Sequence, residues 1–221
     1  MKLPSLHTSI LITFLITTGV ACTHHPKKTA GKYFEGKVTY KSTVSYMKED
    51  SDKVYSGELY NSTFYFKEGN WKQVYDNGPI YEEIFITKEN KSYVKKASRD
   101  TLFYIDERTP GDSIEKYEIH EGVAKIMGIS CNELKIWYKD KTASYYYNPD
   151  YLKLNKAWFK DFINFNKNFT TEKMGTLFLR YKVELNNKRT IFITATGISE
   201  EEIDDKEFKL PGHKVLAKYE Q

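Results

Sequence analysis

The sequence predicts a mainly β domain of the α+β class, built from an antiparallel sheet with one or two short helices. Aromatic residues make up 15% of the chain, and aromatic side chains favour strands. Apolar and polar residues alternate with a period of two along many short segments. Polar joints of hairpin size separate these segments, and this spacing indicates an antiparallel meander and not βαβ units.

The composition limits both the size and the kind of protein. With 221 residues, 40% hydrophobic and 29% charged, the chain suits one globular domain or at most two small ones, and a fibrous or disordered protein is excluded. The net charge of +4, from 34 basic and 30 acidic side chains, is too small and too mixed to indicate a nucleic-acid surface. We therefore expect no nucleic-acid partner, and we expect a monomer.

Residues 1–21 predict a signal peptide. Lys2 precedes an apolar stretch at 10–21, which is shorter than the roughly 20 residues that span a bilayer. Small residues follow the stretch, where a signal peptidase must fit the chain. No later segment is apolar enough to cross a membrane, so the sequence indicates an exported protein.

The end of the signal peptide resembles the lipobox of bacterial lipoproteins. In Gly19-Val20-Ala21-Cys22, the resemblance implies that Cys22 is the lipid-attachment site and anchors the protein to a membrane. The position of Gly19 usually carries Leu, and Gly19-x-Ala21 also suits an ordinary signal peptidase, so cleavage without lipidation stays open.

Residues 22–32 predict a tether, and residues 33–221 a single β-rich domain. The tether is polar, contains Pro and Gly, and lacks periodicity. It has no acidic run, which favours the periplasmic face of the outer membrane over the cell surface. If Cys22 is lipidated, Cys131 has no intramolecular partner, and we interpret it as a small buried hydrophobic residue. An unlipidated Cys22 could form a disulfide with it.

The first strand begins near Phe34. Val38, Tyr40, Val44 and Tyr46 fall on one face, with Lys, Thr and Ser on the other. Six further β-rich segments follow, at 54–60, 63–67, 71–75, 81–87, 92–96 and 102–106.

A loop at 107–112 interrupts the chain near its middle, and the strand pattern then resumes. Apolar residues from Ile126 to Tyr138 share a face in one run, a second run lies at 142–147, and a last hairpin pairs 177–185 with 190–196 across the turn at 186–188. In the first arm of that hairpin, alternation places Leu177 and Leu179 on one face, and Phe178 and Arg180 on the other.

Two segments predict helices. Trp158, Phe159, Phe162 and Ile163 recur at helical spacing among polar residues, which predicts a helix over 156–167. Ser199-Glu-Glu-Glu202 matches a capping box and predicts a second, shorter helical turn.

The sequence offers no set of catalytic or metal-binding residues. It contains no G-x-S-x-G nucleophile elbow, and no histidine stands at a metal-ligand spacing from a cysteine or carboxylate. The acidic residues at 200–205 lack the spacing of a calcium loop, and we interpret them as favouring a helix N-terminus. We therefore expect no enzymatic activity, no metal and no cofactor.

Two short motifs are candidate O-glycosylation sites. Asp100-Thr101-Leu102 and Asp112-Ser113-Ile114 match the Asp-Ser/Thr-apolar motif that some Gram-negative lineages modify in periplasmic proteins. Thr101 and Ser113 would be the modified residues, and both lie at predicted joints.

Several short motifs together resemble a family of uncharacterised secreted proteins. They are the first strand at 34–40, the runs at 125–131 and 145–149, Gly175, and the run at 207–211. These motifs are similar to motifs of the outer-membrane lipoprotein sorting (LolA/LolB-like) and GLPGLI-type proteins. The similarity extends over most of residues 33–211. The resemblance implies a strongly curved antiparallel sheet that forms an incomplete barrel, with helices across its concave face and an apolar cavity between them.

The resemblance implies no catalytic residue. We expect a non-enzymatic lipoprotein of the cell envelope that binds or shelters an apolar ligand, such as a lipid or the acyl chains of another protein. Trp158, Phe159, Phe162 and Ile163 are the candidate lining of its cavity. The alternative is a structural or sensory envelope module that binds a protein partner through its convex face or its edge strands.

Overall fold

The computed structural model describes residues 33–47, 53–186, 188–210, 212 and 215–219. The predicted signal peptide, Cys22 and the tether lie outside these residues. Among the described residues, no helix combines the length and the apolar character that crossing a membrane requires.

The described residues form one sheet of twelve strands, in the order β12-β6-β5-β4-β3-β2-β1-β11-β10-β9-β8-β7. Neighbouring strands are antiparallel, except that β12 runs parallel to β6. The strands are β1 (Gly36–Met47), β2 (Val54–Lys67), β3 (Asn70–Tyr75), β4 (Ile80–Ile86), β5 (Lys91–Lys96), β6 (Thr101–Asp106), β7 (Ile114–Ile126), β8 (Ile129–Tyr138), β9 (Lys141–Tyr147), β10 (Arg180–Leu185), β11 (Arg189–Glu200) and β12 (Val215–Lys218).

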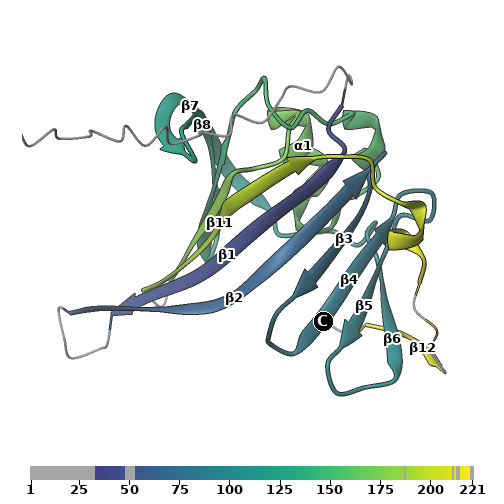
Figure 1. The fold of residues 1–221 in the computed structure, drawn as a ribbon. Coiled ribbons are helices and arrows are strands. Elements are labelled where there is room, and N and C mark those ends of the chain that lie inside the picture. Colours follow the sequence, from purple (N-terminus) through teal and green to yellow (C-terminus); the bar gives the residue numbers. More distant parts are fainter. Residues whose placement is uncertain (1–32, 48–52, 187, 211, 213–214, 220–221) are drawn as a thin grey trace, which may run out of the picture.

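The sheet is curved and open. In Figure 1, the long strands β1 and β2 run diagonally through the molecule, with β7 and β8 to one side of them and β5 and β6 to the other. The end strands β7 and β12 do not pair with each other, so the sheet does not close into a barrel. The predicted fold class, a mainly β domain with an open, curved antiparallel sheet, is confirmed.

The predicted strands at 54–60 and 63–67 are one strand, β2. It pairs with β1 along its whole length, from Gly36 opposite Phe66 to Met47 opposite Val54. A register shift between Ser42 and Thr43 interrupts the regular pairing. Such a bulge breaks the alternation of apolar residues without ending the strand, and the sequence pattern therefore suggested a gap.

The predicted helix over 156–167 is wrong in its extent. The structure has two 3-10 turns there, η1 (Lys156–Phe159) and η2 (Asn164–Asn166), and an α-helix, α1 (Lys167–Met174), that starts where the predicted helix ends. Phe165 and Asn166 both have positive φ, 52° and 55°, which an α-helix cannot contain. We refer to residues 156–167 as the crossing segment.

The predicted helical turn at Ser199 is also wrong. β11 continues to Glu200, because Ser199 pairs with Lys37 and Glu200 with Gly36 in β1. The helical turn comes later, as η3 (Asp205–Phe208), where the Asp204 side chain accepts a hydrogen bond of 2.9 Å from the Lys206 backbone N–H.

The main hydrophobic core lies between the inner face of the sheet and the crossing segment. Val38, Phe66 and Phe85 from the sheet are almost fully buried, and Phe159 and Phe162 cover them. Cys131 is fully buried in the same core, and its Sγ donates a hydrogen bond to the carbonyl of Ile129. Burial raises the pKa of this thiol, which agrees with its interpretation as a small hydrophobic residue.

Candidate functional site

The crossing segment packs on the sheet through contacts between aromatic rings. The ring centroid of Phe85 in β4 lies 4.7 Å from that of Phe162 and 6.0 Å from that of Phe159. On the other side, the Phe85 ring lies 5.9 Å from Trp71 in β3. Aromatic pairs at such distances contribute beyond the area that they bury, so these contacts hold the segment over the inner face.

Backbone hydrogen bonds fix the far end of the crossing segment to the loop after β6. The carbonyl of Glu107 accepts hydrogen bonds from the N–H groups of Ile163, at 2.7 Å, and Asn164, at 2.9 Å. The side-chain amide of Asn166 donates to the carbonyl of Asp112 at 2.8 Å. These bonds join parts of the chain that lie more than 50 residues apart, and they divert the segment from a continuous helix.

Two glycines allow the backbone to approach the crossing segment closely. A Cβ atom at Gly111 would lie 3.0 Å from the backbone N of Phe165 and 3.1 Å from that of Asn166. Gly69, with φ of +84° in the turn between β2 and β3, touches Trp158, and a Cβ there would lie 2.8 Å from the Trp158 side chain. Larger residues at either position would displace the segment.

Beside these contacts, a cavity of about 250 Å³ remains between the inner face of the sheet and the crossing segment. Its walls are mainly apolar and aromatic, with a few polar groups. Its lining residues are Tyr40, Tyr60, Phe64, Trp71, Gln73, Tyr75, Glu83, Glu107, Phe162, Phe165, Lys167, Leu177, Phe178 and Ile193.

The structure places the four candidate lining residues in different environments. Phe162 lines the cavity, whereas Trp158, Phe159 and Ile163 are not among its lining residues. Phe159 is 1% exposed and belongs to the solid core below the segment, and Ile163 is 37% exposed on its outer side.

Apart from Phe162, the lining residues were not identified from the sequence, and three of them show why. Phe165, which is 67% exposed, and Lys167 come from the end of the crossing segment. Phe178 lines the cavity together with Leu177, although strict alternation places the two on opposite faces. The regular strand β10 begins only at Arg180, so the strand rule does not apply to residues 177–179.

Two carboxyl groups lie on the cavity wall. Burial, with a smaller contribution from the negative charge of Glu107, raises the pKa of Glu83 to about 7, and a hydrogen bond with Tyr75 acts in the opposite direction. Burial also raises the pKa of Glu107, against the opposing influence of the nearby Ser92 and Asn164 side chains. Near neutral pH, a large fraction of Glu83 is therefore protonated and uncharged.

One ammonium group faces the same cavity. Lys167 is half-buried, and burial lowers its pKa to about 8. Its Nζ lies 5.5 Å from the centre of the Phe159 ring. Within the described part of the chain, this Nζ has neither a carboxylate oxygen within 4.0 Å nor a hydrogen-bond partner. Likewise, no three His, Cys, Asp or Glu side chains of that part are grouped as metal ligands.

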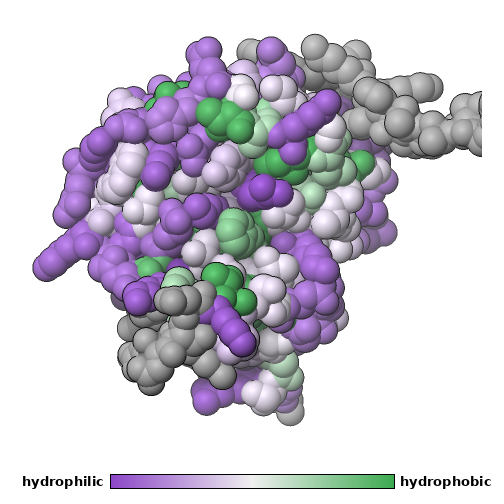
Figure 2. All heavy atoms as spheres, turned by 90° about the vertical axis from the view of Figure 1, so that its left-hand side faces the viewer, coloured by the Kyte–Doolittle hydropathy of each residue, from purple (hydrophilic) through white to green (hydrophobic). Residues whose placement is uncertain are grey.

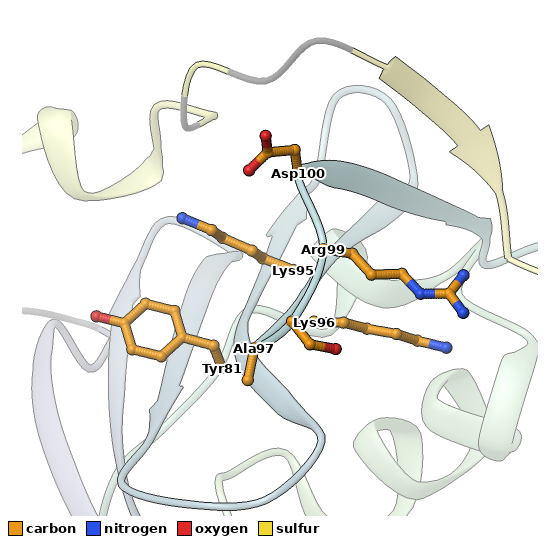
Figure 3. A pocket seen from close by; sticks show the side chains of 7 residues that line it. Tyr81, Lys95, Lys96, Ala97, Arg99 and Asp100 are labelled. Carbon is orange, nitrogen blue, oxygen red and sulfur yellow. The ribbon is translucent and has the colours of Figure 1, made fainter.

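A larger hollow, of about 660 Å³, lies outside this region, at β4, β5 and the turn after β5. Figure 3 shows Tyr81 and Lys95 pointing to one side of the turn, and Lys96 and Arg99 to the other. The cationic groups therefore do not converge on one point. Such a polar surface does not suit an apolar ligand.

The two candidate O-glycosylation sites occupy different positions. Thr101 is the first residue of β6, is half-buried, and pairs with Val215 of the neighbouring β12. Ser113 is exposed in the loop immediately before β7. Modification at either residue stays a prediction, which a mass measurement on peptides from the native host would test.

The sequence matches no protein-family model, and no curated protein matches it. Among solved structures, the chain is similar to a LolA superfamily protein from Nitrosomonas europaea, with a TM-score of 0.39 and 9% sequence identity. The similarity covers 81% of this chain and 92% of that one. At this TM-score and identity, the likeness assigns the chain to no family.

Proposed function

We propose that this protein is a non-enzymatic protein of the cell envelope that shelters an apolar ligand, such as a lipid or an acyl chain, in the cavity under the crossing segment. The observation that carries the proposal is the cavity itself, which is lined by aromatic and aliphatic side chains from both the sheet and the segment. Its volume of about 250 Å³ is close to the lower end of the range of small-molecule sites, roughly 300–1,000 Å³. It therefore suits one slender chain better than a bulky ligand.

The proposed location depends on the sequence. The predicted signal peptide and the lipobox-like Gly19–Cys22 run support an exported protein that is anchored through Cys22. We place it, as part of the proposal, on the periplasmic face of the outer membrane.

Native mass spectrometry tests the proposal. We expect the Cys22→Ser form, which needs no detergent, to leave its native host with a bound apolar molecule. We expect Ile193→Phe to reduce the occupied fraction, because Ile193 lines the cavity. Ile191→Phe is the matched control, since it makes the same change two residues earlier on β11 at a position that does not line the cavity.

Two outcomes would contradict the proposal. The first is a protein that carries no bound molecule and takes up no apolar probe in solution. The second is a bound molecule whose occupancy falls equally in Ile193→Phe and Ile191→Phe.

A specific observation favours a second candidate function, the binding of a protein partner. The 13-residue strand β7 lies at the end of the sheet, and Ile119, Val123 and Met127 are exposed on it and at its turn. In the face drawn in Figure 2, hydrophobic residues form small separate areas among hydrophilic ones. A partner at β7 would therefore depend on backbone pairing with the edge more than on a large apolar patch.

A further inference from the structure

We propose that the cavity selects a single-chain amphiphile with a carboxylate headgroup, and that the Lys167 ammonium binds this carboxylate. This inference rests on the proposed function, because it names the class of ligand that the same cavity would take. It concerns the headgroup, whereas the proposed function concerns only the apolar part of the ligand.

The Lys167 ammonium has no anionic partner among the residues that the structure describes. Its side chain lines the cavity beside Phe162 and Phe165, and its Nζ lies over the Phe159 ring. Among the residues that the structure describes, no carboxylate approaches the ammonium within ion-pair distance. Charged groups that are withdrawn from water are normally paired, so the ammonium in this cavity is an incomplete interaction that an anionic ligand would complete.

The position of Lys167 on its helix strengthens the argument. Lys167 is the first residue of α1, and the first turn contains no acidic residue. The N–H groups of Lys167, Asn168 and Phe169 already donate to Asn164, Phe162 and Asn168, so they are not free to bind a ligand. The aligned peptide dipoles of the helix still leave partial positive charge near its N-terminus, which favours an anion and disfavours a cation close to Lys167.

The two carboxyl groups on the wall limit the charge of that anion. Glu83 and Glu107 line the same cavity as Lys167, and a headgroup with two negative charges would be repelled by either of them when ionised. A carboxylate carries a single charge, which the one lysine neutralises. Since a large fraction of Glu83 is protonated near neutral pH, it can also donate a hydrogen bond to a carboxylate oxygen.

The remaining wall suits a hydrocarbon chain. Phe64, Trp71, Leu177 and Ile193 also line the cavity. An alkyl chain against these side chains would bury apolar surface. A cation and an apolar wall in one cavity together suit the chemistry of a fatty acid.

Calorimetry with matched ligands tests the inference on the full-length Cys22→Ser protein after its native ligand is removed. The probes are decanoate and 1-decanol, which have the same chain and differ in the charge of the headgroup. We expect decanoate to bind about tenfold more tightly than decanol, as a charge-assisted hydrogen bond implies. In Lys167→Met this preference is expected to disappear while decanol binding persists. In Lys173→Met, a change on the same helix at a residue that does not line the cavity, the preference is expected to remain.

The possible outcomes separate the two proposals. Equal binding of decanoate and decanol by the unmutated chain, or an unchanged preference in Lys167→Met, would overturn the carboxylate inference and leave the apolar site standing. Failure of both probes to bind would overturn the proposed function and the inference with it. A 13C signal of carboxyl-labelled decanoate that shifts on binding to the unmutated chain, but not on binding to Lys167→Met, would support direct contact.

Discussion

At the scale of single residues, the burial and the charge of Lys167 conflict. It lies against the Phe159 ring inside an apolar cavity, where the ammonium has lost part of its hydration. Lys72 differs in this respect. It is also half-buried, but it pairs with Glu82 at 3.2 Å and with Glu207 at 3.1 Å.

We expect Lys167→Met to stabilise the ligand-free protein. Burial lowers the pKa of Lys167 to about 8, whereas an unfolded lysine titrates at about 10.4. The protonated form is therefore disfavoured in the folded state, and its removal should raise the free energy of unfolding at pH 7.5 by about 1–2 kcal/mol, after allowance for the partial exposure of the side chain. Urea denaturation measures this difference.

The sign of the pH dependence provides a second readout of the same prediction. Between pH 8 and 10, the unfolded chain binds more protons at Lys167 than the folded chain, so the stability of the unmutated protein should rise relative to Lys167→Met. The advantage of the variant is expected to shrink over this interval. A constant difference between the two proteins from pH 7.5 to 9.5 would show that the charge of Lys167 does not cause it.

The sequence identifies Phe162 as a candidate lining residue but does not identify Lys167. Phe162 stands in an aromatic run whose spacing indicates a buried face. Lys167 stands at the end of that run among polar residues, where a solvated lysine is the ordinary expectation. Its burial depends on the turn at Phe165 and Asn166 and on the contacts of Glu107, which come from a distant part of the chain.

At the scale of elements, the crossing segment has a structural part and a ligand-facing part. We expect Phe159→Ala to lower the free energy of unfolding by about 3–5 kcal/mol, as for other large buried aromatic residues, because the Phe159 ring is stacked with Phe66 and Phe85. We expect Phe165→Ala, at an exposed residue, to change it by less than about 1 kcal/mol.

In ligand binding, we expect the order to be reversed, with the larger effect in Phe165→Ala and the smaller one in Phe159→Ala. Phe165 lines the cavity, so Phe165→Ala should weaken the binding of an apolar probe, which a fluorescence titration measures. If Phe165→Ala unfolds at much lower urea than the unmutated chain, or binds the probe equally well, the division of the segment into these two parts is wrong.

The sheet was more predictable from the sequence than the helix was. Most strands alternate apolar and polar residues, because one side faces the core. The α-helix Lys167–Met174 has no such signal: its buried residues are Thr170, Thr171 and Met174, two of which are polar. The strand β7 is mostly exposed. It also lacks a regular buried face, so the alternation of apolar and polar residues did not define where it starts.

At the scale of the whole molecule, the curvature of the sheet could not be predicted from the alternation of apolar and polar residues. Alternation tells which face of a strand is buried, but it does not tell how far the sheet bends. The register shifts at Thr39/Tyr40 and Ser42/Thr43 in β1 are bulges, which increase local twist and bend a strand. The extra residues are Thr196 in β11 and Leu59 in β2, and the alternation of apolar and polar residues does not tell that they are unpaired. The incomplete barrel was instead implied by the family resemblance.

The two ends of the open sheet differ, and this difference tests the second candidate function. If a partner binds by pairing with β7, the double variant Ile119→Lys/Val123→Lys should abolish its cross-linking in native envelopes, because charged side chains protect sheet edges. Leu216→Lys, at an exposed position on the opposite end strand β12, is the control. An unchanged cross-linking pattern in the double variant would exclude β7 as the docking edge, and ligand binding should be the same in all three proteins.

Gly111 lies where the loop after β6 comes close to the crossing segment, so its identity in related chains should affect the width of the cavity. Because a Cβ atom at this position would lie 3.0 Å from the backbone of the crossing segment, alanine would require a small shift of the segment, and a larger side chain would push it further from the loop. Among related sequences, glycine at the equivalent of position 111 should accompany a narrow cavity like this one. Relatives with a side chain there should have a wider cavity and, on the proposed function, bind thicker ligands, so this one alignment column would distinguish related chains by the width of their cavity.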